Sequence, residues 1–213
     1  MNAFSRNALR IETPAVGPAP VTLASLIPDR ARALGCMTFD SYCDLIDKEA
    51  TAHLTGGPLA RVSRLRQYRR PRPFFDRSTG KHCLSVPLNS TGTMYAKVDA
   101  ADWFEMQELG VRGLWTATNV GGGRIHAYTE YPMKNHAVTV ARLILGLGAG
   151  QQVSFADGDS LNLRRSNLLT TEQREPRAGL RRRARYDARE VAREAAALRD
   201  QMVAEGRRFD VTS

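Results

Sequence analysis

The chain has 213 residues, of which 42% are hydrophobic and 7% aromatic, so it can bury one modest core and carry helical arms beside it. Its formal net charge is +9 with a pI near 10.0, which predicts an anionic partner, nucleic acid before a membrane surface. No apolar run reaches the roughly 18 to 20 residues that a bilayer span needs, and the chain does not open on a signal peptide. We therefore expect a cytoplasmic protein that does not enter a membrane.

The cysteines and histidines do not form a recognisable metal site. Cys36, Cys43 and Cys83 make no Cys-x-x-Cys pair, and a zinc site that combined them with His53 or His82 would lack the usual paired spacing. Three reduced thiols are the simpler interpretation in a cytoplasmic protein. We therefore expect no metal and no cofactor.

The first part of the chain is expected to hold an arm and a helical basic segment. Residues 1–37 predict a flexible arm, because prolines and small residues fill its early positions without a periodic pattern. Residues 38–83 predict the helical basic segment. It begins with a helix from about Thr38 to Leu54, which the Thr38 side chain can cap.

The later part of that segment is strongly basic. From Arg61 to His82 it holds seven Arg and one Lys against one Asp, interleaved with Tyr68, Phe74 and Phe75. One interpretation is a segment that follows phosphates and stacks its rings on bases. The other is a solvated linker whose rings pack on a neighbouring domain. We favour contact with nucleic acid, because the rest of the chain is basic as well.

Residues 84–175 have the pattern of a small α+β domain. The stretches CLSVPL and MYAKVD alternate apolar and polar residues as short strands do, and DAADWFEMQELG predicts a short helix that ends at Gly110. A hairpin is expected on either side of the three glycines at 121–123. A further strand, HAVTV, then runs into an apolar helical turn, ARLILGLG. The predicted fold class is α+β with a small antiparallel sheet.

Residues 176–213 predict a basic C-terminal helix, because alanine and arginine are strong helix formers and an apolar stripe recurs along the tail. Arg181, Arg182 and Arg183 in its first turns oppose the helix dipole, so we expect an anion to compensate them. Three arrangements stay open for the stripe: packing on the body, packing on a second copy of the chain, or solvation.

The stretch VSFADGDSLNLRRSNL, residues 153–168, follows VPLNSTGTMYAKVDAADWFEMQELG, LWTATNVGGGRIHAY and VARLILG along the chain. In this order the four segments resemble the HNH homing-endonuclease-like proteins of bacteriophages. The family writes the last segment as Val-Asp-His-x-Asp-Gly-Asn, followed by Asn-Arg-x-x-Asn-Leu. The resemblance implies a degenerate ββα-metal finger of the HNH type, with a sheet like that of the plant ethylene-response-factor DNA-binding domain and helical basic arms on either side.

The sequence departs from the family pattern at the positions of the metal ligands and the general base. An Asp-His step in the family supplies a metal ligand and the general base, and here those positions are Ser154 and Phe155. The family's His on the preceding helix is Ala141 here, and an Asn later in the stretch is Leu163. Phe cannot accept a proton, and Ala and Leu cannot bind a metal. We therefore expect no catalytic residue.

The same stretch keeps a loop and a set of cations. Asp157 and Gly158 are expected to make the tight turn between the finger's two strands, and Asn162 and Asn167 to bind the loop backbone. The resemblance implies that the Trp-bearing hairpin lies against DNA. Surface or internally paired arginines are the alternative interpretation. The residues expected to contact DNA are Arg112, Trp115, Arg124, Arg142, Arg164, Arg165, Arg181, Arg182 and Arg183.

Three functions follow from these patterns. The leading expectation is a catalytically inactive HNH-like protein of phage or prophage origin that binds duplex DNA as a regulator or architectural factor. The first alternative is a protein-binding accessory or inhibitor subunit, with a protein partner or a homodimer in place of DNA. The second is a residual metal-dependent endonuclease that uses Asp157 and Asp159 with His126 or His136 as a new base.

Overall fold

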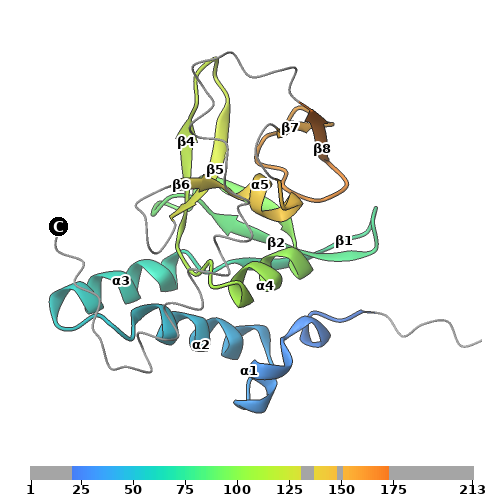
Figure 1. The fold of residues 1–213 in the computed structure, drawn as a ribbon. Coiled ribbons are helices and arrows are strands. Elements are labelled where there is room, and N and C mark those ends of the chain that lie inside the picture. The colour runs from blue at the N-terminus through green and yellow to red at the C-terminus, as the bar shows by residue number, and fades with distance from the viewer. Residues whose placement is uncertain (1–20, 131–136, 148–150, 173–213) are drawn as a thin grey trace, which may run out of the picture.

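The structure, a computed structural model, describes residues 21–130, 137–147 and 151–172 (Figure 1). The first helices follow one another along the chain, and short strands come after them with α4 and α5 between. None of the described helices combines the length and the apolar character needed to cross a bilayer. The helices are η1 (Ala24–Leu26, a 3-10 helix), α1 (Asp29–Ala33), α2 (Phe39–Thr51), α3 (Gly57–Tyr68), α4 (Ala100–Glu108) and α5 (Val140–Leu145).

The strands of the described residues form three small antiparallel sheets. The first has the order β1-β2-β3, the second has the order β4-β5-β6, and the third pairs β7 with β8. This confirms the predicted α+β class. The strands are β1 (Arg72–Asp76), β2 (Lys81–Pro87), β3 (Tyr95–Asp99), β4 (Trp115–Asn119), β5 (Ile125–Glu130), β6 (Ala137–Thr139), β7 (Gln151–Phe155) and β8 (Leu168–Glu172).

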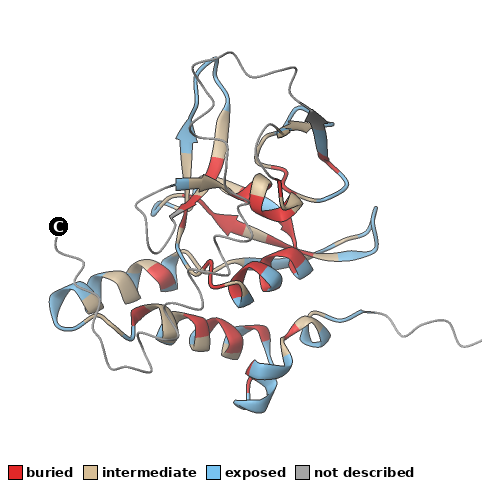
Figure 2. Ribbon diagram, viewed as in Figure 1, coloured by how far each residue is buried: buried red, intermediate tan, exposed pale blue. Residues whose placement is uncertain are grey.

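Helix α2 begins where the sequence predicts and carries the N-terminal part of the chain onto the sheets. The Thr38 hydroxyl accepts a hydrogen bond from the Ser41 N–H at 3.2 Å, and the Ser41 hydroxyl accepts one from the Thr38 N–H at 3.0 Å. The buried face of α2 then meets α4. There the ring of Tyr42 lies 4.9 Å from that of Phe104 and 6.0 Å from that of Trp103. These aromatic contacts place α2 and α4 in one core (Figure 2).

The expected flexible arm does not extend to residue 37. Ile27 and Ala31 are fully buried in the common core, because the apolar side chains of η1 and α1 find partners on the body. Residues 21–37 therefore belong to the folded part, which corrects the expected boundary. Residues 1–20 of the arm and the expected C-terminal helix at 176–213 lie outside the described residues.

The basic segment expected to be helical over residues 38–83 is helical only as far as Tyr68. Residues 72–76 form β1, in which Phe74 pairs with Cys83 of β2, so the expected boundary after residue 83 falls inside a strand. β1 lies at the edge of its sheet, where a proline such as Pro73 is tolerated. The basic segment is thus partly built into the first sheet.

Residues 156–167, which we call the β7–β8 loop, connect the two strands of the third sheet. The turn expected at Asp157 and Gly158 is only the beginning of this connection. Gly158, with φ +77°, donates its N–H to the carbonyl of Phe155 at 3.1 Å, and the chain then runs on to β8. The residues after Glu172, where a ββα finger would continue, lie outside the described part of the chain.

The middle of the β7–β8 loop lies along β3. The N–H of Lys97 donates to the carbonyl of Leu161 at 2.8 Å, and the N–H of Leu163 donates to the carbonyl of Lys97 at 2.7 Å. The loop thus adds a short parallel bridge to the first sheet. This pairing fixes the third sheet on the first.

Candidate nucleic-acid interface

The buried side chain of Asn167 holds the β7–β8 loop together. Its amide oxygen accepts a hydrogen bond from the Asp157 N–H at 2.8 Å, and its amide nitrogen donates to the carbonyls of Asn162 at 2.8 Å and Asp159 at 3.3 Å. The amide of Asn162 donates to the Asp157 carboxylate at 2.6 Å and accepts from Arg164 Nε at 2.8 Å. The loop is therefore shaped by its own polar side chains.

The two carboxylates of the loop are engaged within it. Hydrogen bonds from the Asn162 side chain and the Asp159 N–H lower the pKa of Asp157, and Asp159 accepts from the Leu161 N–H at 2.9 Å. Within the described ranges, no group of three or more His, Cys, Asp or Glu side chains is placed to hold a metal ion. His136 lies outside these ranges. The observed role of Asp157 and Asp159 is turn formation.

The positions that the resemblance to HNH proteins would assign to metal ligands and a base are packed mainly with apolar side chains. Leu163 is 1% exposed and Ala141 is buried in the same core. Phe155 is half-buried, and its ring meets that of His126 edge to face with centroids 5.8 Å apart. Ser154 is half-buried on β7. Of these four residues, only Ser154 has a polar group in its side chain, and a hydroxyl that no neighbouring base activates is a poor general base.

Arg164 and Arg165 form ion pairs inside the molecule. Arg164 pairs with Asp76 at the end of β1. The Nε of Arg165 donates to Asp102 of α4 at 2.8 Å, and the guanidinium lies 3.7 Å from Glu105. Burial raises the pKa of Asp102 and outweighs the attraction of Arg165. To bind a phosphate, either guanidinium would have to contact the phosphate and its carboxylate partner at the same time.

Arg112 and Trp115 are largely buried, which corrects the expectation that they contact DNA. Trp115 is 2% exposed, because β4 begins inside the core, and its carbonyl accepts a hydrogen bond from Arg69. Arg112 is 14% exposed and pairs with Glu49 of α2 at 2.9 Å. A ring buried to this degree cannot lie on a duplex. The exposed residues of the hairpin are those farther along β4 and at its glycine tip.

Arg124 and Arg142 line the same groove, between the β4–β5 hairpin, α5 and β7. This hairpin groove has a volume of about 530 Å³ and is also lined by His126 and Tyr128 of β5 and by Gln152 of β7. Its described lining contains no Asp or Glu. Arg124 and Arg142 are 18 residues apart in the sequence. They come together because β5 pairs with β6, and β6 leads directly into α5.

The polar side chains of the hairpin groove differ in their exposure and in their hydrogen bonds. Arg124 is exposed, whereas Arg142 donates to the carbonyls of Gln151 at 2.5 Å and Leu147 at 3.4 Å and so also braces α5 against β7. Burial, and to a smaller extent the charge of Arg124, lowers the pKa of His126, which favours the neutral imidazole. The groove therefore combines cationic charge with a hydrogen-bonding ring.

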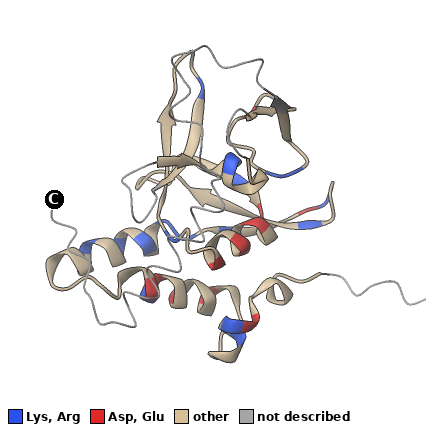
Figure 3. Cartoon of the chain, in the orientation of Figure 1, with Lys and Arg blue, Asp and Glu red and all other residues tan. Residues whose placement is uncertain are grey.

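A second set of exposed cations lies on α3 and on the β1–β2 hairpin (Figure 3). The sequence indicated this segment as basic but not which of its charges face outward. This set has five cations, and none of them forms an ion pair with another residue of the described ranges. Two exposed aromatic rings lie in the same segment, those of Tyr68, 72% exposed, and Phe75, 53% exposed. These cations are Arg61 and Arg64 of α3, Arg72 of β1, Arg77 of the turn and Lys81 of β2.

The chain matches no known family model, no curated protein and no solved structure. The remaining residues expected to contact DNA, Arg181, Arg182 and Arg183, lie outside the described residues. The described part of the chain therefore presents two cationic surfaces: the hairpin groove and the set on α3 and the β1–β2 hairpin.

Proposed function

We propose that the protein binds nucleic acid, duplex DNA before RNA, through the hairpin groove. The observation that carries this proposal is that Arg124 and Arg142 line one groove whose described lining holds no carboxylate. A phosphate that enters the groove meets positive charge without repulsion, and each nucleotide of a backbone supplies such a phosphate. Three glycines at the tip of the hairpin, all with positive φ, have no heavy atom within 4 Å of an added Cβ, which leaves that backbone open to a close approach.

The exposed cations of α3 and the β1–β2 hairpin support the same proposal as an extension of the footprint. They have no internal carboxylate partner in the described ranges, so their charge is available to phosphates. Tyr68 and Phe75 provide exposed aromatic faces in the same segment. This surface adds affinity that depends on salt rather than on base sequence.

We further propose that the protein is a catalytically degenerate relative of the phage HNH proteins and serves as a regulator or architectural factor. Apolar side chains at Phe155, Leu163 and Ala141 support this, because the family's hydrolysis needs a base and metal ligands there. The engagement of Asp157 within its own loop supports it as well. In this proposal the chain binds DNA without cutting it.

Binding of a fluorescently labelled duplex, followed by anisotropy over a series of salt concentrations, tests the proposal. We expect affinity to fall linearly with salt on logarithmic axes, and Arg124→Ala to weaken binding and reduce the slope by about one. Lys48→Ala is the matched control, because it removes one exposed cation from α2, outside both surfaces. Binding that ignores salt, or equal losses in the two variants, would contradict the groove as the binding site.

A plasmid-nicking assay with magnesium or manganese separates this proposal from the nuclease alternative. We expect no metal-dependent nicking. Nicking that Asp157→Ala abolishes would favour a residual endonuclease. If the wild-type protein fails to bind duplex but holds a protein partner stoichiometrically after nuclease treatment, the accessory-subunit alternative replaces DNA binding.

A further inference from the structure

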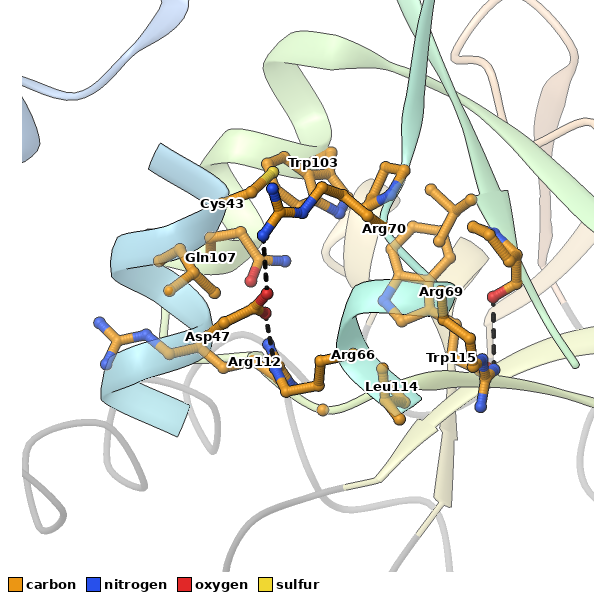
Figure 4. Close-up of a pocket in the computed structure, with 15 residues that line it drawn as sticks. Cys43, Asp47, Arg66, Arg69, Arg70, Trp103, Gln107, Arg112, Leu114 and Trp115 are labelled. Atoms are coloured by element: carbon orange, nitrogen blue, oxygen red, sulfur yellow. Dashed lines mark hydrogen bonds and ion pairs between the residues drawn. The ribbon is translucent and has the colours of Figure 1, made fainter. Parts of the chain in front are cut away.

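Four arginines surround a small cavity where the end of α3 meets β4 (Figure 4). This arginine pocket has a volume of about 40 Å³. Asp47 is the one carboxylate among its described lining residues, and the rings of Trp103 and Trp115 form part of its wall. The arginines are Arg66 of α3, Arg69 and Arg70 directly after that helix, and Arg112 from the segment before β4.

Three of the four arginines are balanced by carboxylates, but Arg69 is not. Arg66 pairs with Asp47 at 2.7 Å, Arg70 pairs with Asp44 and Asp47, and Arg112 pairs with Glu49.

The guanidinium of Arg69 instead donates to two backbone carbonyls, those of Pro87 at 3.3 Å and of Trp115. Burial lowers the pKa of Arg69, and no carboxylate opposes that effect. The pocket therefore holds one cation whose charge no described carboxylate neutralises.

The pocket also contains donors without acceptors. The Nε atoms of Arg69, Arg70 and Arg112 are buried and have no hydrogen-bond partner. A buried donor without an acceptor costs about 1 to 3 kcal/mol, and such atoms are rare in folded proteins. The guanidinium groups of Arg69 and Arg112 lie on opposite sides of the pocket (Figure 4), so the donor that concerns an ion beside Arg69 is the Nε of Arg69 itself.

We infer that the arginine pocket binds a phosphate-sized oxyanion, with Arg69 as its main cation. A negative ion beside Arg69 supplies both missing elements, an acceptor for its Nε and a charge opposite its guanidinium, whereas water supplies only the first. The volume accommodates about three water-sized groups, which suits a compact oxyanion and excludes a nucleotide.

The bound ion would also fasten α3 to the sheets. Arg66 already donates to the carbonyl of Arg112 at 2.7 Å, before β4, and Arg69 donates to the carbonyl of Trp115, the first residue of β4. An oxyanion beside Arg69 adds a charge-assisted bond to the same junction. This inference does not depend on the proposed function, because the arginine pocket and the hairpin groove share no residue.

The two tryptophans of the chain, Trp103 and Trp115, both line the pocket, so their emission reports on it. The test is a titration of the full chain with inorganic phosphate against sodium chloride at equal ionic strength, followed by tryptophan emission, calorimetry and the melting temperature. We expect a saturable emission change, one ion bound per chain and a raised melting temperature with phosphate alone. Equal responses to phosphate and chloride would overturn the inference.

Two pocket variants and one groove variant locate the ion. Arg69→Gln is expected to weaken phosphate binding about tenfold or more, since it removes a charge-assisted hydrogen bond. Should this variant unfold, Arg69→Lys keeps the positive charge and removes the Nε donor, so it should weaken binding as well. Arg124→Ala should leave phosphate binding unchanged while it weakens duplex binding. Wild-type phosphate affinity in the folded pocket variants would overturn the assignment.

Discussion

Arg164 of the β7–β8 loop forms an ion pair with Asp76, which lies 88 residues earlier at the end of β1. The same carboxylate accepts hydrogen bonds from the hydroxyls of Ser78 at 2.7 Å and Thr79 at 2.9 Å. One aspartate thus closes the β1–β2 turn and holds the later loop on the first sheet. An arginine that the sequence marks for phosphate is in this way used to join two distant segments.

The titration of Asp76 makes this junction sensitive to acid. Hydrogen bonds from the Ser78 and Thr79 hydroxyls, and more weakly the charge of Arg164, lower the pKa of Asp76 to about 2. A carboxyl whose pKa is lower in the folded chain stabilises the fold above its unfolded pKa of about 4. It loses this contribution as the pH falls toward about 2. We expect the urea midpoints of wild type and Asp76→Asn to differ fully at about pH 5 and above and to converge as the pH falls toward about 2; a difference that stays constant down to that pH would refute this.

Loss of the Arg112 side chain should lower stability, whereas loss of the Arg124 side chain should lower duplex affinity. Arg112→Ala removes a largely buried partner of Glu49, so we expect it to lower the free energy of unfolding by about 1 to 3 kcal/mol and to leave duplex affinity within about twofold. Arg124→Ala, at an exposed site, should do the reverse. Urea melts and anisotropy titrations on both variants check this crossed pattern. Loss of duplex affinity in a folded Arg112→Ala protein would restore the sequence-based expectation.

Leu163 is adapted to an apolar site, so the residue that the family places there should not be tolerated. Leu163→Asn buries an amide at a position 1% exposed, and we expect a loss of about 2 to 4 kcal/mol of stability. Leu163→Ile is the control and should cost under about 1.5 kcal/mol. A fully stable asparagine variant would show that the site has room and partners for a polar ligand.

Asn167 carries more of the loop's stability than an exposed asparagine does. Its side chain makes three hydrogen bonds to loop backbone groups while buried, so Asn167→Ala should cost about 2 to 3 kcal/mol. Asn119→Ala removes one bond, to the Gly121 N–H at the hairpin tip, and should cost about 1 kcal/mol or less. Chemical denaturation of both proteins measures the difference. Equal losses would mean that the loop is held by its backbone alone.

The sequence predicted the elements that depend on local pattern and missed those that depend on distant contacts. Thr38 indicated the start of α2, because a capping side chain acts within one turn. β1 was missed, because its residues, RPFFD, include a proline and do not alternate apolar with polar side chains, and its partner lies in the next strand. For the candidate site, Asn167 could be predicted from turn chemistry. The burial of Trp115 and the ion pair between Arg112 and Glu49 could not, since each needs the packed helices and sheets.

The backbone pairing of Lys97 with Leu161 and Leu163 has a consequence for assembly. A strand whose amides face open solvent is a template on which another chain can form a strand. β3 would be such a strand without the β7–β8 loop, because β2 covers only its other side. The loop thus shields β3 from adding strands of neighbouring molecules, and a chain cut before residue 161 should gain a tendency to aggregate through that exposed edge.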